Sequence, residues 1–210
     1  MTNLSQEQLI KYLKGRGVLH SARLERALWQ IKREHFVSPA YQAEAYNDYP
    51  LGIGWAQTIS QPTTVVFMLE KLQVELGDKV LDVGAGSGWQ TALLSYLVGQ
   101  TGRVIGLEII GDLVSKAREN INRYQLDNVQ IVHADGHDGF SLSAPYDKII
   151  VSAAASQVPE NLLSQLRLGG SLIVPVGQGV QDVVLIKKIA QDRFDKQKFP
   201  GFIFVPFVKK

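Results

Sequence analysis

Short apolar runs alternate with helical patterns through the middle of the chain. In order along the sequence, these segments cover residues 65–72, 80–83, 90–98, 104–107, 113–124, 129–132, 148–152, 160–166 and 171–176. Alternation of this kind is typical of βα units, and continuous apolar runs are typical of strands that are buried on both faces. The pattern therefore predicts an α/β fold with a doubly wound, mostly parallel sheet.

The N-terminal segment has a different pattern. Ser5 and Gln8 have the spacing of a capping box, which predicts a helix that begins near Ser5. Ser21 precedes apolar residues with i, i+3, i+4, i+7 spacing, so a second helix is expected after it. Residues 37–62 contain several prolines and glycines. They predict a long loop, and loops of this length are often functional.

The pattern changes again after Gly179. Residues 183–189 and 202–208 resemble two strands, and the charged stretch QDRFDKQK lies between them. We expect these strands to form an antiparallel hairpin at one edge of the sheet, with the tail FIFVPFVKK as an edge strand.

Composition excludes several classes of protein. The 210 residues are 45% hydrophobic and carry a net charge of +2, so a disordered chain is ruled out. There is no cysteine, which excludes disulfides and thiolate chemistry. We expect no membrane span and no secretory signal, hence a soluble cytoplasmic protein. The basic residues form no dense stripe, so we expect no nucleic-acid partner.

The first candidate for chemistry is a glycine-rich turn. Residues 80–90 read VLDVGAGSGWQ, so an apolar strand runs through Asp82 into Gly84, Ala85, Gly86 and Gly88. Glycine permits positive φ angles and lets the backbone approach a ligand closely. In an open parallel sheet, ligands bind beyond the carboxyl ends of the strands. The alternative is a glycine-rich turn in an α/β domain that binds no ligand.

Two cofactor classes could use this turn. A dinucleotide fingerprint, G-x-G-x-x-G, would need glycine where Trp89 stands. A carboxylate at Asp82 would repel a pyrophosphate, but it suits a cation. S-adenosyl-L-methionine (SAM) has a sulfonium and an α-amino group and lacks phosphate, so it is the expected cofactor.

Two further acidic residues follow later strands. Glu108 ends the run RVIGLE, 20 residues after Gly88, where an acidic residue can accept hydrogen bonds from both ribose hydroxyls. Asp135 and Gly136 follow the run VQIVH, and Asp135 could accept a hydrogen bond from an adenine amine.

Blocks outside the glycine turn resemble one known family. AYNDYPLGIGWAQTISQP at 45–62, REHFVS at 33–38 and APYDKIIVSAAASQVPENLLSQLRLGGSLIVPVG at 144–177 resemble the ordered blocks of protein-L-isoaspartate O-methyltransferases. The glycine motif LDVGAGSGWQTALLS resembles theirs as well. The resemblance covers about residues 24–208 and implies a Rossmann-like class I SAM-dependent methyltransferase.

The resemblance implies an activity and a set of residues. Family members methylate the free carboxyl of isoaspartyl residues in damaged proteins, and the ester then collapses to a succinimide. In this reading Ser60 is the catalytic residue, and isoaspartyl peptides and proteins are the substrates. Expected cofactor contacts are Thr58, Ile59, Ser60, Asp82, Gly84, Ala85, Gly86, Gly88, Glu108, Asp135, Gly136 and Gln181. No metal is expected.

The same resemblance suggests how the chain is organised. We expect a single, monomeric methyltransferase domain. Its helices and substrate loop would occupy residues 1–62, the SAM-binding core 63–178 and the C-terminal strands 179–210. Some positions depart from the family pattern: Ser38 replaces a usual proline, and Ala56 stands where many members have glycine. These changes could alter the shape of the loop, but they remove no proposed functional group.

Carboxyl methylation needs little acid–base machinery, because a carboxylate with a pKa near ~4 is already ionised at neutral pH. A hydroxyl at Ser60 could donate to one carboxylate oxygen, and the helix after Pro62 could aim free N–H groups at the same anion. Ser60 could instead be a plain helix N-cap. We expect surface or packing roles for His133 and His137. Trp55 and Trp89 could pack in the core or stack on adenine.

Other functions remain open from the sequence. A SAM-dependent methyltransferase of a small molecule or nucleic acid is one alternative, although no Asn-Pro-Pro loop and no cysteine nucleophile are present. A catalytically silent SAM-binding protein is the other.

Overall fold

A computed structural model describes residues 3–209. The α-helices are α1 (Gln6–Gly15), α2 (Ala22–Gln30), α3 (Pro62–Leu72), α4 (Trp89–Val98), α5 (Gly111–Arg123) and α6 (Glu160–Ser164). The strands are β1 (Leu51–Gly54), β2 (Gln57–Ile59), β3 (Lys79–Val83), β4 (Arg103–Glu108), β5 (Val129–His133), β6 (Tyr146–Val151), β7 (Leu166–Val176), β8 (Gln181–Ala190) and β9 (Arg193–Phe202). Short 3₁₀ helices are η1 (Arg33–His35), η2 (Pro39–Glu44), η3 (Gly136–Asp138) and η4 (Ser141–Ser143).

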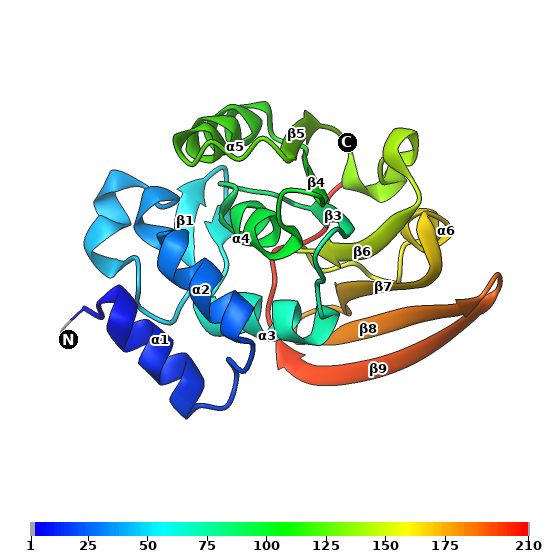
Figure 1. Ribbon diagram of the computed structural model, residues 1–210, viewed down its shortest axis with the longest axis horizontal. Helices are drawn as coiled ribbons and strands as arrows, with labels where there is room; N and C mark the ends of the chain where they lie inside the picture. Colours follow the sequence, from blue (N-terminus) through cyan, green and yellow to red (C-terminus); the bar gives the residue numbers. More distant parts are fainter. Residues whose placement is uncertain (1–2, 210) are drawn as a thin grey trace.

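The main sheet has seven strands in the order β5-β4-β3-β6-β7-β8-β9 (Figure 1). The pairs from β5 to β7 are parallel, and β7, β8 and β9 pair antiparallel. The chain therefore winds outward from β3 in one direction and then from β6 in the other. This confirms the predicted doubly wound α/β fold with an antiparallel hairpin at one edge.

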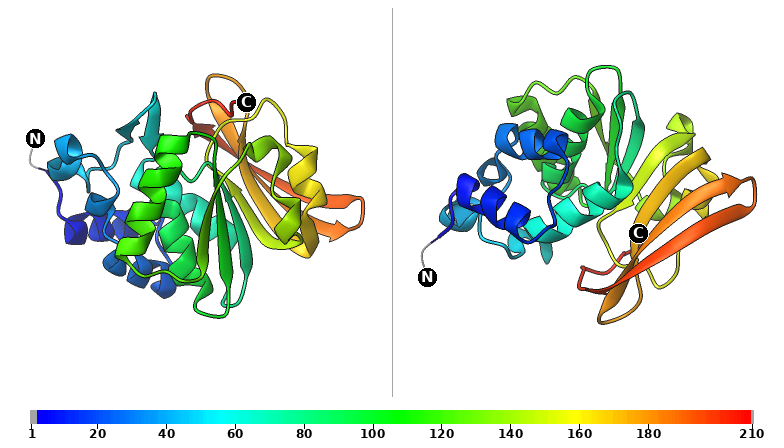
Figure 2. Two further views of the ribbon diagram at one scale, coloured as in Figure 1. Left: turned by 90° about the horizontal axis from the view of Figure 1, so that it is seen from above. Right: turned by 60° about the horizontal axis from the view of Figure 1, so that its bottom comes forward.

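Helices cover both faces of the sheet, and the alternation along β3 shows why. Val80 belongs to the apolar cluster shared with α1 to α5, whereas Leu81 and Val83 belong to the cluster on the α6 face. Successive strand residues point to opposite faces, so a strand that packs on both sides is apolar at most of its positions. Figure 2 (left) shows the sheet between the two groups of helices.

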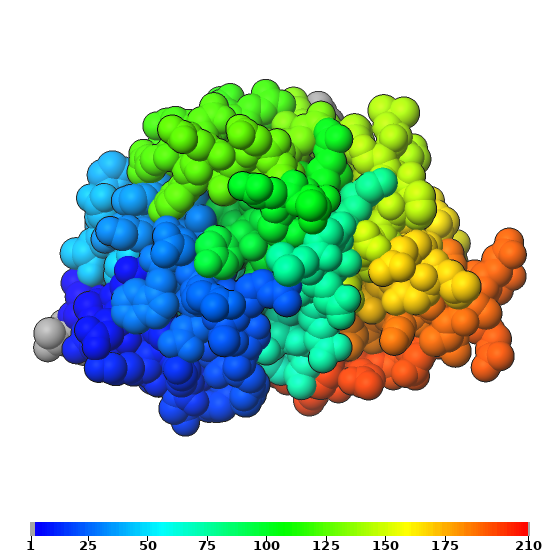
Figure 3. Space-filling model, viewed as in Figure 1, coloured from blue at the N-terminus to red at the C-terminus, as the bar shows by residue number. Residues whose placement is uncertain are grey.

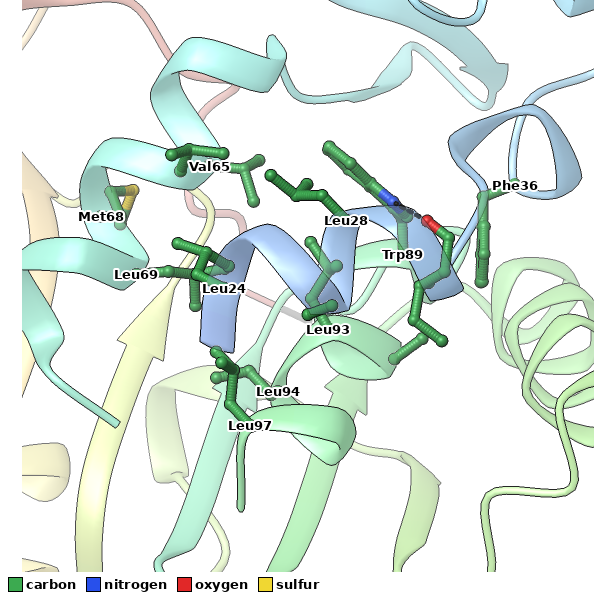
Figure 4. Packing of buried hydrophobic residues seen from close by; sticks show 14 of the residues in the cluster. Leu24, Leu28, Phe36, Val65, Met68, Leu69, Trp89, Leu93, Leu94 and Leu97 are labelled. Atoms are coloured by element: carbon green, nitrogen blue, oxygen red, sulfur yellow. Dashed lines mark hydrogen bonds between the residues drawn. The ribbon is translucent and has the colours of Figure 1, made fainter. Parts of the chain in front are cut away.

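The N-terminal helices are part of the core. Leu24 and Leu28 of α2 pack among Val65 and Leu69 of α3 and Leu93 of α4 (Figure 4). Figure 3 shows this N-terminal segment in direct contact with the α3–α4 region, while the β8–β9 hairpin projects at the opposite end. Within residues 3–209, every helix is too short or too polar to span a lipid bilayer.

The predicted helix starts are confirmed, but the predicted long loop is only partly correct. Ser5 and Gln8 form a reciprocal capping box at the start of α1, and Ser21 caps α2. Residues 37–62, expected as loop, contain η2 and the β1–β2 hairpin. The hairpin turn has positive φ at both Trp55 and Ala56, as in tight two-residue turns. The glycines and prolines therefore marked turns between short elements.

Two boundaries near the C-terminus were predicted wrongly. The helix expected over 160–166 ends at Ser164, because β7 already begins at Leu166. The second strand of the hairpin is β9, residues 193–202, and the predicted strand at 202–208 is absent from the described residues. The charged stretch QDRFDKQK thus lies largely in the strand. Edge strands tolerate such charges, because one edge and much of their surface face water.

Candidate active site

A cleft lies beyond the carboxyl ends of β3, β4 and β6, where the winding of the sheet reverses. It encloses about 830 Å³ of space between protein atoms, the solvent at its mouth included. The β1–β2 hairpin, the glycine turn and the C-terminal residues 205–208 form its walls. Figure 1 shows the C-terminal segment (red) running back from β9 towards the ends of β3 and β4.

The glycine turn after β3 has the predicted geometry. Gly84, Gly86 and Gly88 all have positive φ, of 85°, 55° and 92°. A Cβ atom on Gly86 would lie 3.2 Å from the Ile53 side chain of the hairpin, so the hairpin packs directly over the turn. Gly88 faces away from the cleft and packs against Ala117 of α5. The first two glycines thus shape the cleft, and the third allows α4 and α5 to approach each other.

Glu108 at the end of β4 is buried and lines the cleft. Its carboxylate accepts a hydrogen bond from the Gly86 N–H (2.8 Å). It also accepts from the N–H groups of Ile109 (2.9 Å) and Ile110 (3.0 Å). A carboxylate offers about four lone-pair sites, so one further donor can be accommodated at the side that faces the cleft. Glu108 therefore also braces the glycine turn, a role that the sequence did not predict.

Asp82 does not line the cleft. It is fully buried, and it accepts hydrogen bonds from the Gln90 amide (2.7 Å) and the Thr91 hydroxyl (2.5 Å). Burial raises the pKa of Asp82 to about 6, although these two hydrogen bonds oppose the shift and the charge of Glu108 adds to it. Gln90 lines the cleft and donates a second hydrogen bond to the Ser152 hydroxyl. Asp82 therefore lies behind the turn, and Gln90 connects it to the cleft.

Ser60 lines the cleft between β2 and α3. The N-cap of α3 is Gln61, so Ser60 is not the cap residue that its spacing suggested. Among residues 3–209, nothing accepts or donates a hydrogen bond at the Ser60 hydroxyl. Two positions at the start of α3 offer no free N–H to an anion, because Pro62 has no N–H and Asp48 accepts from the Thr63 N–H (2.8 Å).

Gln181 and Asp135 hold structure around the cleft. The Gln181 side chain accepts from the Phe204 N–H (2.8 Å) and fixes the start of the C-terminal segment. Asp135 caps η3 by accepting from the His137 N–H (2.9 Å). The His137 ring stacks on Phe207, a residue of the cleft wall, with centroids 3.9 Å apart. Through these contacts the last residues of the described chain become one wall of the cleft.

The structure thus brings most of the predicted site residues together. Those that line the cleft are Thr58, Ile59, Ser60, Gly84, Ala85, Gly86, Glu108 and Gly136. Those that lie behind its walls are Asp82, Gly88, Asp135 and Gln181. Trp89 is buried, in agreement with a packing role, and it also lines the cleft. Trp55 lies at the tip of the β1–β2 hairpin, is 53% exposed and does not pack in the core.

Sequence reasoning gave no role to several residues that shape the cleft. Gln90 lies two residues after Gly88, and Ser152 directly follows β6, the strand beside β3. Phe207 belongs to the tail that was expected as an edge strand. Arg33 and Asp48 lie in blocks that carried the family resemblance. No pattern in the sequence indicates that Arg33 is buried or that Asp48 caps α3, because both depend on contacts between distant residues.

The electrostatics of the cleft discriminate between ligands. Of the described residues that line it, Glu108 is the one with an ionisable side chain. The cleft therefore presents no lysine or arginine to a pyrophosphate, while Glu108 and the ionised Asp82 favour a cation. Glycines that admit a close backbone approach and a carboxylate at the end of β4 fit the ribose and methionine parts of SAM. Fold and cleft together define a class I SAM-dependent methyltransferase.

The family follows from comparison with known proteins. The chain belongs to the protein-L-isoaspartate(D-aspartate) O-methyltransferase family, whose sequence profile matches residues 4–210. It is 37% identical over 207 residues to the protein-L-isoaspartate O-methyltransferase of Methanothermobacter thermautotrophicus, covering 98% of this chain and 95% of that protein. It is 40% identical over 206 residues to the enzyme of Methanopyrus kandleri, covering 97% and 91%.

Solved structures agree with this assignment. The crystal structure of a protein-L-isoaspartate O-methyltransferase from Plasmodium falciparum, in complex with S-adenosyl-L-homocysteine, superposes with a TM-score of 0.88 at 28% identity. The match covers 99% of this chain and all of that one. Another protein-L-isoaspartate O-methyltransferase structure has a TM-score of 0.88 at 30% identity, covering 96% of this chain and 65% of that one.

Proposed function

We propose that this protein transfers the methyl group of SAM to the free carboxyl group of isoaspartyl residues in peptides and proteins, and that Ser60 holds that carboxyl. The observation that carries the proposal is the Ser60 hydroxyl, which lines the cleft without a hydrogen-bond partner among residues 3–209. A hydroxyl in this position can donate to a substrate oxygen without first breaking an internal hydrogen bond. Its donor capacity is thus available to the ligand.

The reaction suits a cleft without a general base. Among the described lining residues there is no histidine, lysine or arginine. An isoaspartyl carboxyl has a pKa near ~4, so it is ionised at neutral pH and gives up no proton to the enzyme. Substrates such as amines or alcohols need a proton removed during methylation, and Glu108, the one ionisable side chain among the described lining residues, already accepts hydrogen bonds from three backbone N–H groups.

Several residues of the cleft support the cofactor in this proposal. When bound, SAM supplies an electrophilic methyl group on a positively charged sulfur. Glu108 would accept a hydrogen bond from a ribose hydroxyl, and Gly84 and Gly86 would let the backbone approach the methionine part. Gly136 and the segment at 205–208, which line the cleft, would form the wall beside the adenine. The ionised Asp82 would stabilise the positive charge from behind the turn.

Ser60 would act by positioning. Its hydroxyl would donate to one oxygen of the isoaspartyl carboxylate, leaving the other free to form the new O–CH₃ bond while the C–S bond electrons return to sulfur. The products are a neutral methyl ester and a neutral thioether, and no proton moves. Alignment of the carboxylate with the methyl group can contribute up to ~7–11 kcal/mol. The ester would then collapse to a succinimide.

The decisive experiment compares an isoaspartyl peptide with its aspartyl twin, using SAM with a labelled methyl group. We expect labelling of the isoaspartyl peptide alone, and at least a hundredfold lower kcat/KM for Ser60→Ala. The affinity of that variant for S-adenosyl-L-homocysteine should stay within a few fold, because the serine contacts the acceptor. Ser164→Ala on the exposed side of α6 is the matched control. Equal labelling of both peptides, or of neither, would contradict the proposal.

A further inference from the structure

Arg33 is a buried arginine at the start of η1. Its side chain is among the most deeply buried of the described residues, with 1% exposure. Its guanidinium donates to the carbonyl oxygens of Ala45 and Tyr49, at one end of the loop that carries the hairpin. It also donates to the carbonyls of Ile59 (3.5 Å) and Ser60 (3.1 Å), at the other end. One side chain therefore joins both ends of residues 45–60.

The charge on Arg33 has no close counterion. None of the ion pairs among residues 3–209 includes it. Desolvation lowers the pKa of Arg33 to about 10, and the more distant Asp48 opposes the shift. The guanidinium packs over the Trp89 ring at 5.3 Å, and its Nε atom has no hydrogen-bond partner. Burying a charge in this way is costly, and the four carbonyl oxygens are its main compensation.

The geometry explains why arginine is used here. A guanidinium presents five donors in a rigid planar fork, whereas an ammonium is a compact charge with three donors on a flexible stem. The four carbonyls belong to two separate segments, residues 45–49 and 59–60. A guanidinium is wide enough to bind both segments at once, whereas an ammonium is not. The bond to the Ser60 carbonyl fixes the backbone of the residue whose hydroxyl lines the cleft.

We infer that Arg33 is a positioning residue for methyl transfer: it fixes the Ser60 backbone by tying residues 45–49 to residues 59–60. The inference rests on the function proposed above for Ser60. Arg33 does not line the cleft and so contacts neither substrate nor cofactor. Its effect is on the alignment of the acceptor, where a displacement of about 1 Å can cost ~10²-fold in rate.

The test uses Arg33→Lys in the full chain, with Arg23→Lys as the matched control. Lysine keeps the positive charge but cannot span four carbonyls. Arg23 lies on α2 and donates to a single backbone carbonyl, that of Leu97 (3.2 Å), far from the loop. We measure kcat and KM for the isoaspartyl peptide, affinity for S-adenosyl-L-homocysteine, and amide hydrogen exchange along the chain.

For Arg33→Lys we expect kcat to fall at least tenfold, while affinity for S-adenosyl-L-homocysteine changes by less than threefold. Amide exchange should rise in residues 45–60 and stay unchanged in β3, β4 and β6. Arg23→Lys should match the wild type in every measurement. A general structural role would instead lower cofactor affinity and speed exchange throughout the sheet.

The inference is overturned if Arg33→Lys keeps kcat within threefold of the wild type, or if exchange rises across the sheet. Hydrogen exchange also separates this inference from the proposed function. If the wild type labels no isoaspartyl peptide, the proposed function is wrong. A rise confined to residues 45–60 would still support the role of Arg33 in fixing the loop, and no rise there would overturn it.

Discussion

The buried carboxylate of Asp82 predicts how stability depends on pH. Burial raises its pKa in the folded protein to about 6, compared with about 3.9 for an exposed aspartate. Between these values the folded state keeps a proton that the unfolded state has lost. Stability therefore falls as pH rises from about 4 to about 6. The full cost, present above pH 7, is about 3 kcal/mol at ~1.4 kcal/mol per pH unit.

The perturbation is Asp82→Asn, and the assay is urea unfolding from pH 4 to pH 7.5. Asparagine does not titrate, and any change in its hydrogen bonds to Gln90 and Thr91 contributes equally at every pH. Acidic groups that do not interact with Asp82 affect both proteins alike, so they cancel in the difference, whereas the charge of Glu108 is part of the Asp82 shift itself. We expect the unfolding free energy of the variant, minus that of the wild type, to rise by about 3 kcal/mol from pH 4 to pH 7.

The control is Asp192→Asn, an exposed residue in the turn between β8 and β9. It measures how the removal of an exposed carboxyl changes the unfolding free energy over the same range. If the Asp82→Asn difference also stayed constant within about 1 kcal/mol, the carboxylate would not be desolvated as the structure indicates. At neutral pH the expected state is ionised, which keeps a negative charge behind the glycine turn.

Three further predictions concern the turn, the cofactor pocket and α3. Ala56 has a φ of 56°, a left-handed conformation that strains alanine by ~1 kcal/mol. In Ala56→Gly the relief of this strain is offset by the greater chain entropy of glycine in the unfolded state. The free energy of unfolding in urea should therefore change by less than ~0.5 kcal/mol. Glu108→Gln places an amide against the Gly86 N–H and should weaken S-adenosyl-L-homocysteine binding about 10–100-fold by calorimetry. Asp48→Asn weakens the cap at the Thr63 N–H and should lower the unfolding free energy by about 1 kcal/mol, whereas an unchanged value would show that the cap is dispensable.

Much of the fold could be predicted because its determinants are local or periodic. The runs that became β3 to β6 are mostly apolar, and the capping serines at Ser5 and Ser21 begin α1 and α2 as their spacing indicated. The local pattern did not predict β9, because this strand contains a charged segment. The bounds of β9 depend on its pairing with β8, which the local pattern does not reveal.

The division at residues 62 and 178, the monomeric state, the cytoplasmic location and the individual roles of the site residues stay predictions from the sequence.

The sequence by itself determined the class of site: three glycines after a strand, with carboxylates at the ends of two neighbouring strands, meet at one edge of any parallel sheet. Tertiary structure alone decided which of these groups face the cleft. Asp82 is turned inward because its partners, Gln90 and Thr91, lie on α4. The Ser60 hydroxyl does not cap α3, because Asp48 accepts from the N–H of Thr63, 15 residues further along the chain. Such assignments depend on side chains that converge from distant segments, because a buried polar group without a hydrogen-bond partner costs free energy.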